Sequence, residues 1–223
     1  RFKQEFGLYS IREIDGRDLG VSLTLNHQLI FAAMGMRLLV KGCDDLSDQL
    51  KGFYGLLPDN MLLRRDGLIH HHVRRGRSQF GRNLFDIALF WYRRKIADRS
   101  QGYQSFNLFA MATARRNYPG SAVWKNEQLN AIFPKVLEYA LHPAYLRSIV
   151  DNPFSLAYRL TGPEILWFKK TFSLSGEELG LHQLIKVQFE RHWDPKTGLL
   201  CRNTDDPETL SSRIYEMCYL VEQ

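Results

Sequence analysis

One glutamate in the sequence has the surroundings that general acid catalysis requires. Glu164 follows the dipeptide Gly162-Pro163 in the first turn of an expected helix, and it lies between Tyr158 and Trp167. An aromatic setting raises the pKa of a carboxyl group, because burial penalises its charged form. Glu164 is therefore the first candidate for a catalytic acid. Its alternative role is to pair with the helix dipole, which contributes about 0.3–1 kcal/mol.

A catalytic partner for Glu164 is expected among three other residues. Asp151 or Glu216 would supply the second carboxyl group of a glycosidase, whose two carboxyl groups lie about 5–10 Å apart. His27 titrates near neutral pH and would suit removal of a proton next to a carbonyl, as in a lyase or an epimerase. Each has a structural alternative: Glu216 could pair with Arg213 on one helix face, and His27 could take part in helix capping.

Further polar and aromatic residues gather at the expected helix starts and are suited to sugar binding. Aromatic rings stack on sugar rings, amide groups bond the hydroxyls, and a guanidinium can hold a carboxylate or phosphate with two hydrogen bonds. The alternative is that these residues cap helices or fill the core. The predicted substrate-binding residues are Asn26, Gln28, Tyr103, Gln104, Asn107, Tyr158, Trp167 and Arg213.

Three consecutive histidines, His70 to His72, raise the question of a metal site. In an extended chain His70 and His72 share a face, and two imidazoles can share a metal ion. The spacing of the sequence offers no third ligand. We therefore expect no metal and no cofactor.

The composition is that of a folded protein with an excess of positive charge. The 223 residues are 44% hydrophobic and carry a formal net charge of +6, which suits a domain with an apolar core. Much of the excess comes from Arg64, Arg65, Arg74, Arg75, Arg77, Arg82, Arg93, Arg94 and Lys95. Such a cluster can attract phosphate, uronate or anionic lipid, or it can be a solvated face. No nucleic-acid-binding module is recognised, so no nucleic acid partner is expected.

The cysteines and the apolar runs indicate the compartment. Cys43, Cys201 and Cys218 match no zinc pattern and are too few for a disulfide framework, so we expect buried free thiols in a reducing compartment. No uncharged run of about 18 apolar residues predicts a membrane span. We therefore expect a cytoplasmic protein, and the sequence leaves its oligomeric state open.

The elements that must position these residues are mainly helices. Apolar residues recur at helical spacing, and the expected helices cover residues 26–41, 45–57, 82–97, 103–117, 124–141, 164–172, 176–192 and 207–222. A short helix is also expected from His142-Pro143. Residues 6–19, which contain Asp15-Gly16, predict a β-hairpin or an extended arm. Residues 62–77 predict a long excursion with a turn and short strands.

Prolines and capping residues set the predicted helix boundaries. Pro58 is expected beyond the end of its helix, whereas Pro134 is expected to kink or split its own. Ser175 predicts a cap, and Glu178 three residues later would complete a capping box. Asp206 predicts the cap of the last helix.

Consecutive helices joined by short turns lie antiparallel, and such pairs can close into a ring. Helix starts at one end of the ring would present free N–H groups and a partial positive charge to a common cleft. We therefore predict a single, mainly all-α domain over residues 1–223. Its expected fold is an α/α toroid or partial toroid, with a small β-hairpin or extended arm near the N-terminus.

Five stretches of the sequence carry a resemblance to known proteins. They are NHQLIFAAMG, DGLIHHHV, GYQSFNLFAMA, NPFSLAYRLTGPE and DDPETLSSRIYE. These resemble a group of uncharacterised helical proteins of bacterial polysaccharide gene clusters, the Agl-cluster type. That group is similar to (α/α) toroid carbohydrate enzymes such as unsaturated glucuronyl hydrolases and sugar epimerases. The resemblance implies a full ring of six helix pairs, for which this chain would lack an N-terminal part.

Two functions from different classes follow. The first is a glycan-processing enzyme of polysaccharide metabolism, of the glycoside hydrolase, lyase or epimerase type, whose substrate includes a uronate. The alternative is a non-catalytic scaffold or a glycan- or anion-binding protein that docks through residues 64–77. Geometry discriminates between them, because an enzyme needs two carboxyl groups, or a carboxyl and a histidine, at one site.

Overall fold

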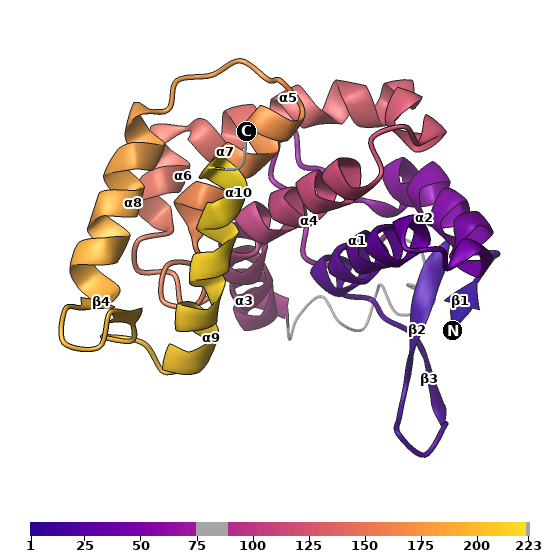
Figure 1. Cartoon of the computed structure of the whole chain (residues 1–223), viewed down its shortest axis with the longest axis horizontal. Helices are drawn as coiled ribbons and strands as arrows, with labels where there is room; N and C mark the ends of the chain where they lie inside the picture. The colour runs from indigo at the N-terminus through magenta and orange to yellow at the C-terminus, as the bar shows by residue number, and fades with distance from the viewer. Residues whose placement is uncertain (75–88, 222–223) are drawn as a thin grey trace.

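The protein is mostly helical and begins with a small antiparallel sheet (Figure 1). The computed structural model describes residues 1–74 and 89–221, with the backbone alone for residues 89–93, 219 and 221. Arg75, Arg77, Arg82 and the side chain of Arg93, together with the predicted helix start at residue 82, lie outside the described residues. The predicted helical class and the predicted N-terminal hairpin are confirmed, while the toroid stays a prediction.

The described elements follow one another along the chain. The strands are β1 (Phe2–Lys3), β2 (Leu8–Arg12), β3 (Asp18–Val21), β4 (Trp193–Asp194) and β5 (Leu199–Leu200). The α-helices are α1 (Leu25–Val40), α2 (Ser47–Asn60), α3 (Leu89–Gly102), α4 (Gln104–Asn117), α5 (Glu127–Leu141), α6 (Pro143–Ser148), α7 (Thr161–Thr171), α8 (Leu179–His192), α9 (Pro207–Ser212) and α10 (Cys218–Val221). Short 3₁₀ helices are η1 (Asp44–Leu46), η3 (Ala122–Lys125) and η4 (Arg213–Met217).

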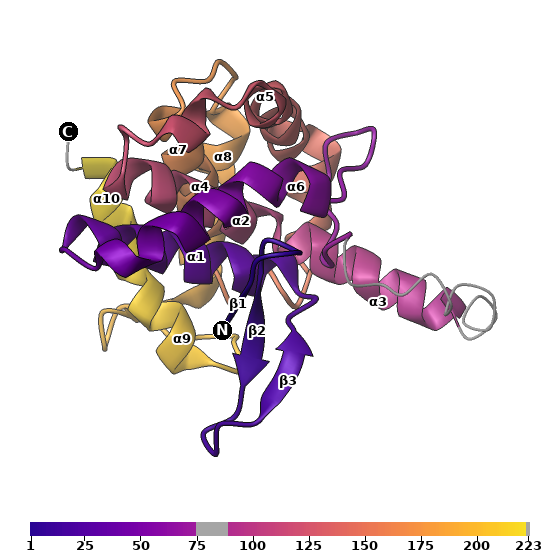
Figure 2. The same cartoon turned by 90° about the vertical axis from the view of Figure 1, so that its right-hand side faces the viewer.

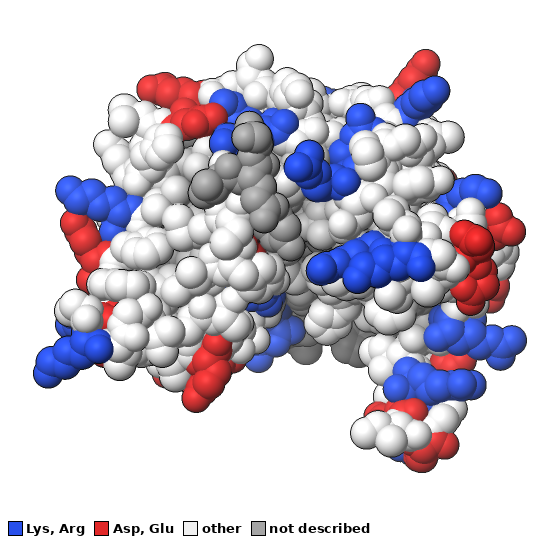
Figure 3. All heavy atoms as spheres, viewed as in Figure 1, with Lys and Arg blue, Asp and Glu red and all other residues white. Residues whose placement is uncertain are grey.

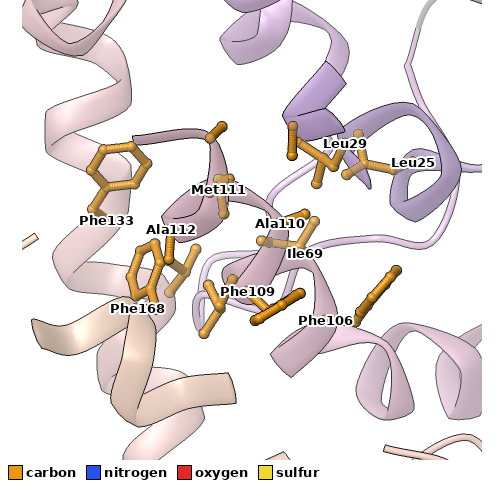
Figure 4. Packing of buried hydrophobic residues seen from close by; sticks show 14 of the residues in the cluster. Leu25, Leu29, Ile69, Phe106, Phe109, Ala110, Met111, Ala112, Phe133 and Phe168 are labelled. Atoms are coloured by element: carbon orange, nitrogen blue, oxygen red, sulfur yellow. The ribbon is translucent and has the colours of Figure 1, made fainter. Parts of the chain in front are cut away.

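The core is built around α4, which packs against both α1 and α7. All of residues 104–114 are buried, so this helix has no solvent-facing side over most of its length. Small side chains such as Ala110 and Ala112 let the neighbouring helices approach closely. Figure 4 shows Leu29 of α1 on one side of α4 and Phe168 of α7 on the other. Both neighbours therefore begin close to the helix that anchors the core.

The N-terminal strands form an antiparallel sheet in the order β1-β2-β3. Its hairpin turn has Gly16 at φ +89°, a conformation that favours glycine. The hairpin of β2 and β3 projects from the helical body in Figure 2. The sheet is fixed to α1 by Gln28, whose Oε1 accepts from the N–H of Tyr9 (2.8 Å) and whose Nε2 donates to the carbonyls of Tyr9 (2.7 Å) and Ser22 (2.9 Å).

The predicted excursion after α2 contacts both α5 and the start of α1. Leu63 pairs with Ile69 in an isolated bridge, and the turn between them has Gly67 at φ +97°. A Cβ at Gly67 would lie 2.2 Å from the carbonyl oxygen of Lys135, so the turn packs directly on α5. Further along, the N–H of Leu25 donates to the carbonyl of His71 (2.9 Å). The excursion therefore holds the start of α1.

Two prolines lie inside helices that continue past them. Pro58 lies in the last turn of α2, and Pro134 lies within α5, which is not split. The predicted boundary at Pro58 and the predicted split at Pro134 are therefore wrong. A proline removes one backbone donor, and α5 tolerates this because buried side chains on both sides of it, Phe133 and Leu137, hold the helix against the core.

The starts of α7 and α8 differ from those predicted. α7 begins at Thr161, three residues before the predicted start at residue 164. α8 begins at Leu179, with Glu178 before it, and not at Gly176. The carboxylate of Glu178 bonds Lys169 of α7. This tertiary partner replaces the capping box that Ser175 would need.

The C-terminal segment, residues 199–221, is broken into short pieces. Asp206 caps α9 as predicted, because its Oδ1 accepts from the N–H of Thr209 (3.0 Å). The single helix predicted over residues 207–222 is wrong, since α9 gives way to η4 and then α10. A small apolar cluster of Leu160, Leu200 and Leu210 holds the segment against the start of α7.

The cysteines are free, as predicted, but they are not buried. Cys43 and Cys201 are half-buried, and Cys218 is exposed, so the predicted burial is wrong. Across residues 1–74 and 89–221, no helix is both long and apolar enough to cross a membrane.

Positive side chains are spread over the surface. On the face in Figure 3, Lys and Arg occur on several elements, and on the hairpin they lie beside acidic side chains. Within the predicted cluster, Arg64 pairs with Asp66 at 2.7 Å, whereas Arg65 and Arg74 are exposed. The described part of the cluster is therefore partly neutralised.

Candidate functional site

Glu164 is buried in the first turn of α7. Its side chain is 0% exposed. Ser105, in the first turn of α4, donates a hydrogen bond to Oε2 of Glu164, while Oε1 has no hydrogen-bond partner. The start of α7 therefore presents a carboxylate oxygen that the fold leaves unsatisfied, which is uncommon for a buried group.

Glu216 brings a second buried carboxyl group from the C-terminal segment. It lies in η4 and is 1% exposed. Nη1 of Arg213 lies 2.8 Å from its Oε1, and Oε2 has no hydrogen-bond partner. The predicted ion pair on one helix face is confirmed, but the pair is buried and one carboxylate oxygen stays unused.

A buried arginine stacks on aromatic rings at the start of α4 and interacts electrostatically with both carboxyl groups. Arg159 is 4% exposed, and its guanidinium carbon lies 3.6 Å from the ring centroid of Phe106 and 4.8 Å from that of Tyr103. Its Nε and Nη1 have no hydrogen-bond partner. Arg159, Glu164, Arg213 and Glu216 are called the charge cluster below.

The charges of this cluster shift the pKa values of its members. Burial, and then the negative charge of Glu164, raises the pKa of Glu216 from 4.5 to about 8. Burial also raises the pKa of Glu164, against the opposing effects of Arg159, the Ser105 hydrogen bond and Arg213. Two carboxyl groups that interact in this way titrate as a coupled pair.

Three helix starts meet at the cluster. The hydrogen bond from Ser105 joins the starts of α4 and α7. The ring of His71, whose backbone holds the start of α1, stacks on the ring of Tyr103 just before α4, with centroids 5.3 Å apart. Helix starts carry a partial positive charge. Together with two arginines, they make the site suited to a negatively charged ligand group.

His27 lies on the exposed side of this site. It is in the first turn of α1 and exposed to solvent. Its partial burial and the positive charge of Arg159 lower its pKa. Asn26 and Asn107, also in first turns, are buried, and each has an Oδ1 without a hydrogen-bond partner.

Two predicted binding residues serve the backbone instead. The amide of Gln28 is taken up by Tyr9 and Ser22. Gln104 accepts from the N–H of Ile69 (3.0 Å) and donates to the carbonyl of Gly67 (3.3 Å). Both amides are thus engaged within the protein and hold the sheet and the excursion in place.

The remaining predicted residues divide between the site and other places. Tyr158 is half-buried, with its ring centroid 5.3 Å from the guanidinium carbon of Arg159. Trp167 is buried within the main core. Asp151 is on the surface, where its Oδ1 lies 2.8 Å from Nη2 of Arg191 and its side chain is 83% exposed. Of the two predicted carboxyl partners, Glu216 is buried and interacts electrostatically with Glu164, whereas Asp151 is in an exposed ion pair.

Three residues of the site were not predicted from the sequence: Ser105, Arg159 and His71. Arg159 and Ser105 lie within stretches that carried the resemblance, next to Tyr158 and Gln104. An arginine flanked by apolar residues five positions before Glu164 was the available signal. The three histidines, in contrast, belong to no group of three or more metal-ligating side chains among the described residues.

The chain is similar to one curated protein with a glycosylation name. Archaeal glycosylation protein Q of Haloferax volcanii is 31% identical over 231 residues, which cover 96% of this chain and 61% of that protein. The chain thus spans less than two thirds of the length of this relative. No family model and no solved structure matches the chain. The sequence-based resemblance concerned bacterial proteins, whereas this relative is archaeal.

Proposed function

We propose that the protein acts on a glycan within a glycosylation process and that the charge cluster is its active site. The observation that carries this proposal is the pair of buried carboxyl groups, Glu164 and Glu216. They come from positions 52 residues apart, counting from 164 to 216, and each has an oxygen without a hydrogen-bond partner. The name of the similar archaeal protein supports a role in making or modifying glycans more than one in degrading them.

The carboxyl pair would work as general acid and general base. Burial raises the pKa of both carboxyl groups, that of Glu216 to about 8, which suits a group that holds a proton for transfer. The proton would pass to the oxygen of a departing sugar or to a carbanion, and the ionised partner would activate water or remove the proton of a carbon acid. A glycoside hydrolase needs such a pair of carboxyl groups, and a lyase or an epimerase could use it as its acid and base.

The arginines would bind an acidic group of the glycan. Arg159 has two guanidinium nitrogens without a hydrogen-bond partner, and Arg213 lies 5.2 Å from the ring centroid of Phe106, on which Arg159 also rests. Guanidinium groups bind carboxylates with two hydrogen bonds. We therefore propose a glycan that contains a uronic acid as the substrate class.

The proposed fold of the whole domain is a partial α/α toroid. Its support is the meeting of the starts of α1, α4 and α7, with α4 packed against the other two. In such a ring the helix starts surround a common site. The substrate would reach the charge cluster from the side of His27.

A panel of oligosaccharides tests the proposal. Oligosaccharides with a hexuronic acid and their carboxyl-reduced counterparts would be incubated with the protein and followed by mass spectrometry. We expect turnover of acidic members only, and a loss of at least about 100-fold in Glu164→Gln and Glu216→Gln, as for removal of a general acid or base. The matched control is Glu208→Gln, an exposed glutamate of α9. Undiminished turnover in Glu164→Gln would remove the carboxyl pair from the reaction.

The second candidate is a glycan- or anion-binding protein without catalysis. It is favoured by the complete enclosure of Glu164, which is 0% exposed. Binding of acidic oligosaccharides by calorimetry, unchanged in Glu164→Gln and with no product formed, would support this function. Arg65 and Arg74, which are exposed, would then contribute to docking.

A further inference from the structure

His71 is a buried histidine whose backbone is hydrogen-bonded within the fold but whose ring nitrogen Nδ1 is not. Its backbone N–H donates to Oγ of Ser100 (3.0 Å), and its carbonyl accepts from the N–H of Leu25 (2.9 Å). The residue is thus fixed between α3 and α1 and is 5% exposed. Its Nδ1, however, is buried without a hydrogen-bond partner. A buried polar atom of this kind costs stability unless a ligand or water satisfies it.

The ring of His71 borders the charge cluster. It stacks on Tyr103 with an interplanar angle of 20°, and the guanidinium of Arg159 lies over the same tyrosine. The exposed His27 acts electrostatically on both His71 and Arg159. His71 is therefore connected to the charge cluster through the ring of Tyr103.

The surroundings keep the ring of His71 uncharged. Burial lowers its pKa to about 4, and the groups that act on it are His72, Arg99, His27 and His70, all of which are positive when they are charged. A neutral imidazole pairs well with a hydroxyl, which can donate or accept. A cationic ligand group would be repelled by Arg99, and a carboxylate, which only accepts, could bond the neutral ring only in the tautomer with its proton on Nδ1.

We propose that His71, supported by Tyr103, forms a sugar-hydroxyl subsite beside the carboxyl pair. Nδ1 of His71 forms a hydrogen bond with a hydroxyl of the glycan, while Tyr103 fixes the plane of the imidazole. This subsite rests on the proposed function of the charge cluster. It contributes binding and orientation, and it takes no part in proton transfer to the substrate.

Two substitutions distinguish the contribution of Nδ1 to binding from that of the aromatic ring. His71→Phe keeps an aromatic ring for Tyr103 and removes Nδ1, whereas His71→Asn keeps a polar atom near the position of Nδ1 and removes the ring. The probe is the panel of hexuronic-acid oligosaccharides, with affinity measured by calorimetry and unfolding followed by urea titration. We expect roughly tenfold weaker binding in His71→Phe, because one hydrogen bond to the glycan is lost. In His71→Asn we expect the affinity to fall by less than about threefold. Binding by His71→Phe as tight as by the wild type overturns the subsite.

A spectroscopic measurement keeps the test independent of folding effects in the variants. In the wild-type protein, ¹⁵N NMR of the imidazole nitrogens should show a neutral His71 at pH 7, whose Nδ1 signal shifts when the bound oligosaccharide is added. A charged ring at pH 7, or an Nδ1 signal that does not respond to a bound oligosaccharide, overturns the subsite.

The failures of the two proposals are distinguishable. If Glu164→Gln abolishes turnover while His71→Phe binds normally, the subsite fails and the proposed function stands. In the opposite case, His71→Phe weakens the binding of acidic oligosaccharides while Glu164→Gln leaves their turnover intact. The catalytic role of the carboxyl pair then fails and the subsite stands. Absence of binding by every member of the panel counts against both.

Discussion

Two sets of buried polar side chains in this protein are treated differently by the fold. Gln28 and Gln104 give their amide groups to backbone atoms of the sheet and of the excursion. The charge cluster keeps unpartnered atoms on Arg159, Glu164 and Glu216, although these side chains are 4% exposed or less. The residues of both sets lie at or near helix starts.

The difference teaches which buried polar groups hold the structure. A satisfied amide stabilises the packing of the elements that it joins, and its loss would leave backbone groups unpaired. An unsatisfied charged cluster costs stability, because desolvation is not fully offset. Proteins retain such costs mainly where function needs them. The comparison therefore assigns Gln28 and Gln104 to the structure and the charge cluster to the proposed site.

The largest effect is expected on the structural side. Gln28→Leu would leave the N–H of Tyr9 and the carbonyl of Ser22 without a partner, while the carbonyl of Tyr9 would keep its bond from the N–H of Ser22. We therefore expect a loss of about 3 kcal/mol in the free energy of unfolding, at about 1–3 kcal/mol for each unsatisfied group. Urea denaturation measures it. The matched control is Gln183→Leu on the exposed face of α8, expected to change stability by no more than about 0.5 kcal/mol. Equal effects of the two substitutions would show that the hydrogen bonds of Gln28 do not stabilise the fold.

A pH-dependent effect of intermediate size is expected from Glu216. Because its folded pKa is raised from 4.5 to about 8, the folded state binds more protons than the unfolded state between these values. Its stabilising contribution is present below pH 4.5 and is lost as the pH rises through about 8. The free energy of unfolding should therefore fall from pH 5 to pH 8 by on the order of 2 kcal/mol more in the wild type than in Glu216→Gln.

Urea titrations of both proteins at a series of pH values provide this comparison. His27, His71 and His192 have lowered pKa values and contribute with the opposite sign, but equally in wild type and variant. Parallel pH profiles for the two proteins would show that Glu216 ionises normally in the folded state.

A smaller effect on stability is expected from Glu164→Gln. The glutamine keeps the shape of the side chain and an oxygen for Ser105, and it removes a charge that burial disfavours. The free energy of unfolding at pH 7 should change by no more than about 1 kcal/mol, although turnover is lost. Thermal denaturation checks this, and a loss as large as that of Gln28→Leu would mean that Glu164 mainly holds the fold.

The smallest effect is expected from Asp151→Asn. Asp151 forms an ion pair with Arg191 in which the two side chains are 83% and 40% exposed, respectively. Exposed ion pairs contribute about 0–1 kcal/mol to the free energy of unfolding. We expect a change below about 0.5 kcal/mol in urea denaturation and unaltered turnover of acidic oligosaccharides. A strong loss of turnover would instead restore Asp151 as the partner of Glu164.

The sequence predicted those parts of the fold that depend on neighbouring residues. Asp15-Gly16 marked the hairpin, His142-Pro143 began α6, and Asp206 capped α9. The boundary at Ser175 failed because Glu178 is engaged by Lys169 of another helix. Such a contact between distant residues leaves no trace in local spacing.

The site could be predicted only in part for the same reason. Residue type and helix position were enough to propose Glu164 and Glu216. They could not tell Gln28, whose amide is fully engaged, from Asn107, whose Oδ1 has no partner. They also missed Arg159 and His71, whose importance depends on burial and on unpartnered atoms, which only the packed structure defines.

The coupling of the two carboxyl groups is most directly tested by ¹³C NMR of protein labelled at the glutamate side-chain carboxyl carbons. We expect one glutamate signal, that of Glu216, to titrate at about pH 8. In Glu164→Gln this titration should move to lower pH, because the negative charge that raises the pKa of Glu216 is gone. Titration of every glutamate near pH 4.5, with no change in the variant, would contradict the existence of a buried, proton-sharing carboxyl pair.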